Sequence, residues 1–206
     1  MAKTGIGVLA SGRGTNFESL VRAVGRERID GEVRVLLANV AGAGAIDRAE
    51  SLGIPAVVVK NRDFKTRAAF EQAMVAELTR HGVELVCLAG FMRILSCTFV
   101  DRFCNRVMNI HPSLLPAFAG LLGIHVHEAV IAAGVKVTGC TVHFVTNDLD
   151  AGPIIVQRAI PVLEADDAES LAERVLVEEH QAYPDAVRLF CEHRLKVEGR
   201  RVRIAD

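Results

Sequence analysis

Asn109 and His111 are the residues whose types and spacing first suggest chemistry. They lie in the stretch VMNIHPSLLP, residues 107–116, where an apolar run ends in an amide and an imidazole and is then stopped by Pro112. Residues two apart in a β-strand project from the same face. An amide N–H and an imidazolium N–H on one face form two donors that converge on a developing negative charge, so the pair predicts an oxyanion site.

His111 has to be protonated near neutral pH to serve in such a pair, and a nearby carboxylate would favour that state. Asp148 and Asp150, in the predicted turn TNDLDAGP over residues 146–153, are the candidates for this carboxylate. Each side chain also has a purely structural interpretation, because a histidine can satisfy local backbone groups and an aspartate can cap a turn. Their combination at the end of one predicted sheet favours the catalytic interpretation.

A second candidate site is the glycine-rich stretch LASGRGTNFESL, residues 9–20, which is typical of a strand, a tight turn and a helix. Gly12 and Gly14 allow the backbone to approach a ligand closely. Thr15 and Asn16 can donate side-chain hydrogen bonds, and the N-terminus of a helix favours an anion. The stretch therefore predicts a phosphate site, with a capped tight turn as the alternative.

The same stretch also indicates which phosphate compound to expect. A dinucleotide fingerprint needs a third glycine, where this sequence has Phe17, and an acidic residue near the end of the second strand, where it has Asn39. The sequence also has no Walker Gly-Lys-Ser/Thr motif. These features favour a small phosphate monoester over a dinucleotide or a nucleoside triphosphate.

The sequence contains no evident nucleophile. It has no Gly-x-Ser-x-Gly elbow, and Ser113 follows Pro112 without a base of its own. Direct transfer between two bound substrates is therefore the better hypothesis. His125 and His127 have no third ligand nearby, and the five cysteines form no Cys-x-x-Cys pair, so we expect neither a metal site nor a disulfide framework.

The elements that have to position these residues follow a regular alternation. Continuous apolar, β-branched runs separated by amphipathic helices predict a doubly wound α/β fold, with a mostly parallel sheet and helices on both faces. Ligands bind at the carboxyl ends of the strands in such folds. The predicted strands are 6–10, 33–40, 55–59, 84–90 and 106–111, and the predicted helices are about 16–25, 43–52, 66–81 and 97–104.

The pattern changes in the last third of the chain. Residues 135–145 and 153–162 predict a β-hairpin, a long C-terminal helix is predicted over about 167–192, and the tail from residue 198 predicts a short terminal strand. There is no internal repeat or linker, so residues 1–206 are expected to form a single domain. The N-terminal stretch is not typical of a signal peptide, which predicts a cytoplasmic protein. A formal net charge of −1 gives no general attraction to nucleic acid or to membrane.

Five stretches together resemble the glycinamide ribonucleotide formyltransferase family of purine biosynthesis, and the resemblance covers nearly the whole chain. They are LASGRGTNF, LAGFMRIL (88–95), NIHPSLLP (109–116), VTGCTVHFV (137–145) and LDAGPII (149–155). The resemblance implies transfer of the formyl group of 10-formyltetrahydrofolate to the amine of 5'-phosphoribosylglycinamide, which gives formylglycinamide ribonucleotide and tetrahydrofolate. It implies a tetrahedral oxyanion intermediate, small-molecule substrates only, and no metal.

The resemblance also assigns roles to residues. Asn109 is expected to bind the formyl oxygen, and His111 to act as general acid and oxyanion stabiliser. Asp150 is expected to raise the pKa of His111 and to help order water, which leaves Asp148 as a turn residue. The ribonucleotide side is implied to be Gly14, Thr15, Asn16 and Glu179.

The folate side implied by the resemblance is a pterin slot formed around the stretch FMRIL and closed by the turn 146–150. Without the resemblance, core packing would be the better interpretation of FMRIL. His143, on the strand that leads to Asp150, is a candidate support for that turn. The expected folate-binding residues are Arg67, Met92, Arg93, Ile94, Leu95 and Asn109.

Three other interpretations remain open. A formyltetrahydrofolate hydrolase uses similar residues but normally has an extra N-terminal domain, and a methionyl-tRNA formyltransferase usually adds a C-terminal barrel and a basic surface. An inert ligand-binding module would not need Asn109, His111 and Asp150 together.

The stretch 117–130 is about two residues longer than the family pattern, with Leu122 where a polar residue is common. The oligomeric state is left open.

Overall fold

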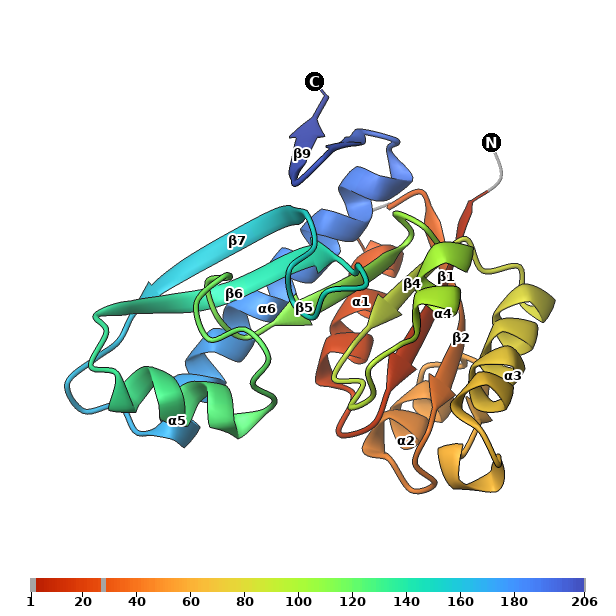
Figure 1. Ribbon diagram of the computed structural model, residues 1–206, viewed down its shortest axis with the longest axis horizontal. Helices are drawn as coiled ribbons and strands as arrows, with labels where there is room; N and C mark the ends of the chain where they lie inside the picture. Colours follow the sequence, from red (N-terminus) through yellow and green to blue (C-terminus); the bar gives the residue numbers. More distant parts are fainter. Residues whose placement is uncertain (1–2, 27–28, 206) are drawn as a thin grey trace.

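The computed structural model describes residues 3–26 and 29–205. In this part of the chain nine strands form one sheet, in the order β3-β2-β1-β4-β5-β6-β7-β9-β8 (Figure 1). The strands are β1 (Thr4–Ala10), β2 (Gly31–Ala38), β3 (Ala56–Val58), β4 (Leu85–Leu88), β5 (Val107–His111), β6 (Val137–Phe144), β7 (Ile154–Pro161), β8 (Leu195–Glu198) and β9 (Arg201–Ile204).

The first five strands are parallel and are covered on both faces. All residues of β1 are buried, which is why that strand is a continuous apolar run without alternation. The predicted doubly wound α/β fold is confirmed. The helices are α1 (Thr15–Arg26), α2 (Gly44–Ser51), the 3-10 helix η1 (Asn61–Asp63), α3 (Arg67–Arg80), α4 (Cys97–Arg102), α5 (Ile124–Ala132) and α6 (Ala168–Cys191).

Two apolar clusters hold the layers together. One lies between the sheet and helices α1, α2 and α6, and includes Phe17, Leu20 and Val175. The other lies between the sheet and helices α3 and α4, and includes Met74 and Phe99. The two clusters fix the sheet from both sides, so the strand ends that carry the polar candidates are held rigidly.

The last third of the chain is built around a hairpin, as predicted. Strand β6 pairs antiparallel with β5 and with β7. Helix α6 begins at a capping box, in which Asp167 accepts from the backbone of Ser170 and the Ser170 hydroxyl accepts in return. The hydroxyl of Tyr183 in α6 lies 3.0 Å from the carbonyl oxygens of both Leu88, at the end of β4, and Met108, in β5, so α6 is bonded directly to both strands.

Two elements differ from the sequence expectation. The tail holds the expected strand as β9, but it is the second half of a hairpin with β8, and Gly199 takes the left-handed conformation at the turn with φ of 60°. Helix α5 is the second difference, because no helix was predicted in the stretch 117–130. It begins after Gly123, and α5 lies at the opposite end of the molecule from α2 and α3 (Figure 1). None of the described helices is long and apolar enough to cross a membrane.

Candidate active site

A cavity of about 490 Å³ opens at the carboxyl ends of β1, β4 and β5, where the doubly wound fold predicts a ligand. Its wall brings together segments that are far apart in the sequence. They are residues 12–16, 88–95, 109–112, 121–124 and 145–150, together with His127, His143, Ala172, Leu176 and Glu179.

Asn109, His111 and Asp150 meet at one place in this wall. His111 Nδ1 lies 3.5 Å from Asp150 Oδ2, and both side chains are buried. The other carboxylate oxygen, Oδ1, lies 3.7 Å from Nε2 of His143, on the neighbouring strand β6. The carboxylate of residue 150 therefore lies between two imidazoles. The structure brings Asp150 to the histidine, whereas Asp148 is exposed in the same turn.

His143 sets the orientation of the Asn109 amide. Nδ1 of His143 lies 3.0 Å from the carbonyl oxygen of Phe144, which can only accept, so this nitrogen carries the proton. In the neutral ring Nε2 is then an acceptor, and it lies 3.2 Å from Nδ2 of Asn109. Burial keeps the pKa of His143 below its usual value, which favours the neutral ring. One N–H of the Asn109 amide is thus used by His143, and the second remains for a ligand.

Asp150 owes its position to an unusual backbone conformation. Its φ is 51°, in the left-handed region that few residues other than glycine adopt, although Asp tolerates it better than most. The backbone N–H of Gly120 donates to Asp150 Oδ2 at 2.9 Å. Two residues on, a Cβ at Gly152 would lie 1.8 Å from the carbonyl oxygen of Phe144, so only glycine fits there. The turn is therefore constrained at both residues.

The protonation of His111 differs from the sequence expectation. Burial lowers the pKa of His111 below its usual value and outweighs the effects of Asp150 and of the Phe118 carbonyl, both of which raise it. The carboxylate stands beside the ring as predicted, but the depth of burial could not be read from the sequence. Nε2 lies 3.2 Å from the Phe118 oxygen, so both ring nitrogens face groups that only accept hydrogen bonds, an arrangement suited to the imidazolium.

The glycine-rich loop lines the cavity. Its backbone N–H groups at Arg13 and Gly14 bond to no other group in the described part of the chain. The amide nitrogen of Asn16, predicted as a phosphate donor, instead bonds to Oε2 of Glu179 at 2.6 Å, and Oδ1 of Asn16 is buried without a partner. Burial raises the pKa of Glu179 to about 7. Asn16 and Glu179 therefore form one buried polar unit beside the loop.

The residues of the predicted pterin slot also line the cavity. Met92 and Ile94 line it with 50% and 64% of their surfaces exposed, so these two residues are not core residues. The backbone N–H of Met92 donates to the hydroxyl of Ser11 at 2.8 Å, which ties the slot to the end of β1. Three more exposed apolar side chains line the cavity: Leu122 from the loop before α5, Ile124 from the first turn of α5 and Leu149 from the turn 146–150. The predicted residues Arg93 and Leu95 also line it.

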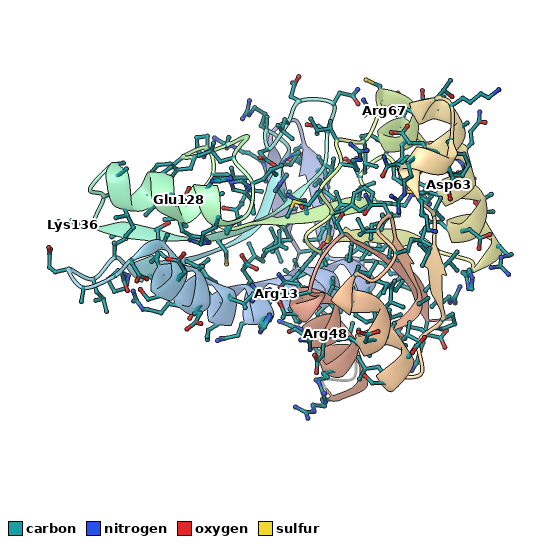
Figure 2. The ribbon with its side chains drawn as sticks, turned by 90° about the horizontal axis from the view of Figure 1, so that it is seen from below. Arg13, Arg48, Asp63, Arg67, Glu128 and Lys136 are labelled. Carbon is teal, nitrogen blue, oxygen red and sulfur yellow. The ribbon has the colours of Figure 1, made fainter. Side chains whose placement is uncertain are left out.

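Arg67 is the predicted residue that the structure places outside the cavity wall. It begins α3, apart from Arg13 in Figure 2, and its Nε bonds to Oε1 of Glu71 at 2.9 Å. The same carboxylate accepts from the backbone N–H of Ser96 at 2.8 Å. The Arg67 guanidinium is half exposed.

His127 is a cavity residue that sequence reasoning did not place in the site. It is 4% exposed and its Nδ1 has no partner among the described residues, whereas His125 in the same helix is exposed and bonds to Glu128 at 2.7 Å. Burial and the nearby His111 lower the pKa of His127. Residues 3–26 and 29–205 contain no cluster of three side chains that could hold a metal ion.

Comparison with known proteins adds independent information. Residues 5–187 match the model of the formyl transferase family. The chain is 40% identical to phosphoribosylglycinamide formyltransferase of Bacillus subtilis, over 88% of this chain and 91% of that protein. It resembles the crystal structure of glycinamide ribonucleotide transformylase 1 from Symbiobacterium toebii, with a TM-score of 0.96 and 48% identity over 100% of this chain and 95% of that one.

Longer proteins also match. The chain is 44% identical to the trifunctional purine biosynthetic protein adenosine-3 of Gallus gallus, over 95% of its own length. It spans only 19% of that protein, so it corresponds to a part of the trifunctional relatives.

Proposed function

Because the chain belongs to the formyl transferase family, we propose that it transfers the formyl group of 10-formyltetrahydrofolate to the amine of 5'-phosphoribosylglycinamide. The products are formylglycinamide ribonucleotide and tetrahydrofolate. One observation carries the proposal: one cavity is lined by Asn109, His111 and Asp150, by a loop whose N–H groups at Arg13 and Gly14 have no partner among the described residues, and by the exposed apolar residues of the slot. An anionic substrate and a cosubstrate with a flat ring system can thus meet at the polar groups.

Two parts of the cavity wall suit the two substrates. The phosphate binds at Gly14, Thr15 and Asn16, where the N–H groups of the loop and the N-terminus of α1 favour an anion. Glu179, whose pKa is raised to about 7, contacts the ribose hydroxyls as an acceptor or, when protonated, as a donor. The pterin of the folate lies in the slot formed by Met92, Arg93, Ile94 and Leu95, against Asn109. Arg67, whose half-exposed side chain lies outside this wall, contacts the more distant part of the folate.

The polar groups act on the formyl carbon. The glycinamide amine attacks this carbon, a C–N bond forms, and the electron pair of the C=O bond moves onto oxygen. The free N–H of the Asn109 amide and the Nε2–H of His111 stabilise that oxygen. Nε2 has a single N–H, which points to the Phe118 carbonyl in this structure, so the formyl oxygen has to replace that carbonyl.

The second half of the reaction releases the folate. The electron pair returns from oxygen to carbon and the bond to N10 of the folate breaks. A proton leaves the former amine and reaches N10, through water ordered by Asp150 or through His111. Asp150 favours the imidazolium form of His111, and His143 holds the Asn109 amide with its N–H toward the substrate. No covalent enzyme intermediate is needed.

One assay tests the proposal against its rivals. The absorbance change of 10-formyltetrahydrofolate is followed with and without the ribonucleotide, and we expect turnover only when both are present. Turnover that ignores the ribonucleotide would instead indicate a formyltetrahydrofolate hydrolase. No turnover under either condition, with folate binding retained, would indicate a ligand-binding module.

A further inference from the structure

Helix α2 holds the phosphate-binding loop from the side opposite the cavity. The backbone N–H of Ala45 donates to the carbonyl oxygen of Gly12 at 3.1 Å, and Nε of Arg48 donates to the carbonyl oxygen of Arg13 at 2.8 Å. Figure 2 shows Arg13 and Arg48 next to each other on these two elements. Two consecutive carbonyl groups of the loop are thus bonded to α2.

Because peptide bonds are planar, the two bonds to α2 also fix the direction of the N–H groups of the loop. In a trans peptide the C=O of one residue and the N–H of the next point in opposite directions. Because the carbonyls of Gly12 and Arg13 point to α2, the N–H groups of Arg13 and Gly14 point away from it, toward the cavity that this loop lines. Gly14 has φ of 76°, and successive N–H groups next to a left-handed residue form an anion-binding concavity.

The close contact between Gly14 and α2 restricts the backbone conformation of the loop. A Cβ at Gly14 would lie 2.6 Å from Cα of Ala45, so the backbones of the loop and α2 are in direct contact. The guanidinium of Arg48 is fixed in turn, since its Nη1 bonds to Glu18 in the first turn of α1. Glu18 also pairs with Arg22 at 2.7 Å. The planar guanidinium therefore bridges the loop and the helix that follows it.

We propose that Arg48 is a positioning residue for phosphate binding. Arg48 does not line the reaction cavity; it lines a separate cavity of about 430 Å³ on the far side of the loop, with Glu18 and Arg22. It therefore acts through the Arg13 carbonyl, which it holds outward so that the N–H of Gly14 faces the phosphate. This inference rests on the proposed function, because the phosphate belongs to the ribonucleotide.

The test separates the binding of the two substrates. In Arg48→Met the aliphatic stem and the helix-forming tendency are kept, but the bond to the Arg13 carbonyl is lost. We expect the KM for the ribonucleotide to rise about 10-fold, the scale for one charge-assisted hydrogen bond to phosphate. The KM for the folate and kcat should stay within about twofold of the wild type, because the reacting groups are untouched. The inhibition constant of inorganic phosphate should rise in parallel.

Two further variants sharpen the result. Arg22→Met removes a cation from the same cluster without touching the loop, and its KM values should match the wild type. Arg48→Lys keeps the charge but lacks the planar fork that reaches both the Arg13 carbonyl and Glu18, so the KM for the ribonucleotide should remain raised. This variant also replaces Arg48→Met if the latter fails to fold.

The outcomes distinguish this inference from the proposed function. A wild-type KM for the ribonucleotide in folded Arg48→Met, full recovery in Arg48→Lys, or equal rises in both KM values would overturn the role of Arg48. A wild-type enzyme that ignores the ribonucleotide would overturn the proposed function instead. A second readout needs no turnover: the amide resonance of Gly14 should shift on titration with inorganic phosphate in the wild type, and should do so only at higher phosphate concentration in Arg48→Met.

Discussion

The Asp150→Asn substitution tests most directly how the carboxylate acts. The change keeps the shape of the side chain and removes its charge, which lies 3.5 Å from Nδ1 of His111. Burial already lowers the pKa of His111, and Asp150 is the main group that opposes this effect. Loss of the charge therefore lowers the pKa of His111 further. Because the protonated ring is the active form, activity at a given pH above that pKa falls with the protonated fraction.

The distance sets the size of the effect. Two unit charges 3.5 Å apart interact by about 5 kcal/mol at an effective dielectric constant of about 20. Water in the open cavity screens part of this, so we take about half. At about 1.4 kcal/mol for each factor of ten, the protonated fraction of His111 falls about 10²-fold, and kcat/KM falls with it.

The assay is the dependence of kcat/KM on pH, with both substrates, for Asp150→Asn and the wild type. We expect the fall of activity at high pH to begin at a lower pH in the variant, with a loss of about 10²-fold on the basic side that becomes smaller on the acidic side. Asp148→Asn, in the same turn but exposed, is the matched control and should follow the wild type. A uniform loss at every pH, with an unshifted profile, would refute the effect of Asp150 on the pKa of His111.

Three other predictions concern different parts of the structure. His111→Ala should lower kcat about 10²-fold and leave the KM for the ribonucleotide nearly unchanged, as steady-state kinetics will show, because the oxyanion donor is lost but the phosphate loop is not. Burial raises the pKa of Glu179 to about 7, so the native state holds this proton more tightly than the unfolded chain, and stability falls as pH rises from about 4.5 to about 7. In urea unfolding, Glu179→Gln should therefore be more stable than the wild type by up to about 3 kcal/mol at pH 8 and by much less at pH 4.5. A stability difference between variant and wild type that does not depend on pH would contradict this. Gly152→Ala should lower both stability and kcat, since the added Cβ meets the Phe144 carbonyl, whereas Gly25→Ala, where a Cβ meets nothing within 4 Å, should stabilise the protein or leave it unchanged.

The parallel half of the fold could be predicted because its local signals agree with its tertiary environment. Strands buried on both faces, such as β1, are apolar without interruption, and the start of helix α6 is indicated by its acidic N-cap residue, Asp167. Helix α5 lacks such a signal. It follows Gly123, whose φ is 57°, without a side-chain cap, and its apolar residues do not repeat on one face. Strand β8 is only half-buried and is short, so its pattern is equally weak.

The candidate site also has residues that the sequence could predict and residues that it could not. Asn109 and His111 could be paired from their spacing alone, since a strand fixes which side chains share a face. The choice between Asp148 and Asp150 could not be made from the residues, because it depends on the left-handed backbone at Asp150. The burial of His127 and the pKa of His111 depend on how α5 and the loop before it pack, which no local pattern records. The roles of these residues in catalysis stay predictions.

The bonds of Tyr183 in α6 to β4 and β5 have an experimental use. Tyr183 is the only tyrosine of the chain, which contains no tryptophan, and its hydroxyl is shared between the carbonyls of Leu88 in β4 and Met108 in β5. Ultraviolet emission from the intact protein therefore originates almost entirely at one buried residue, which bonds to the carbonyl of Leu88 in the cavity wall. A pterin absorbs in the range where tyrosine emits, so loading of the slot can be followed as energy transfer from Tyr183, without an attached dye.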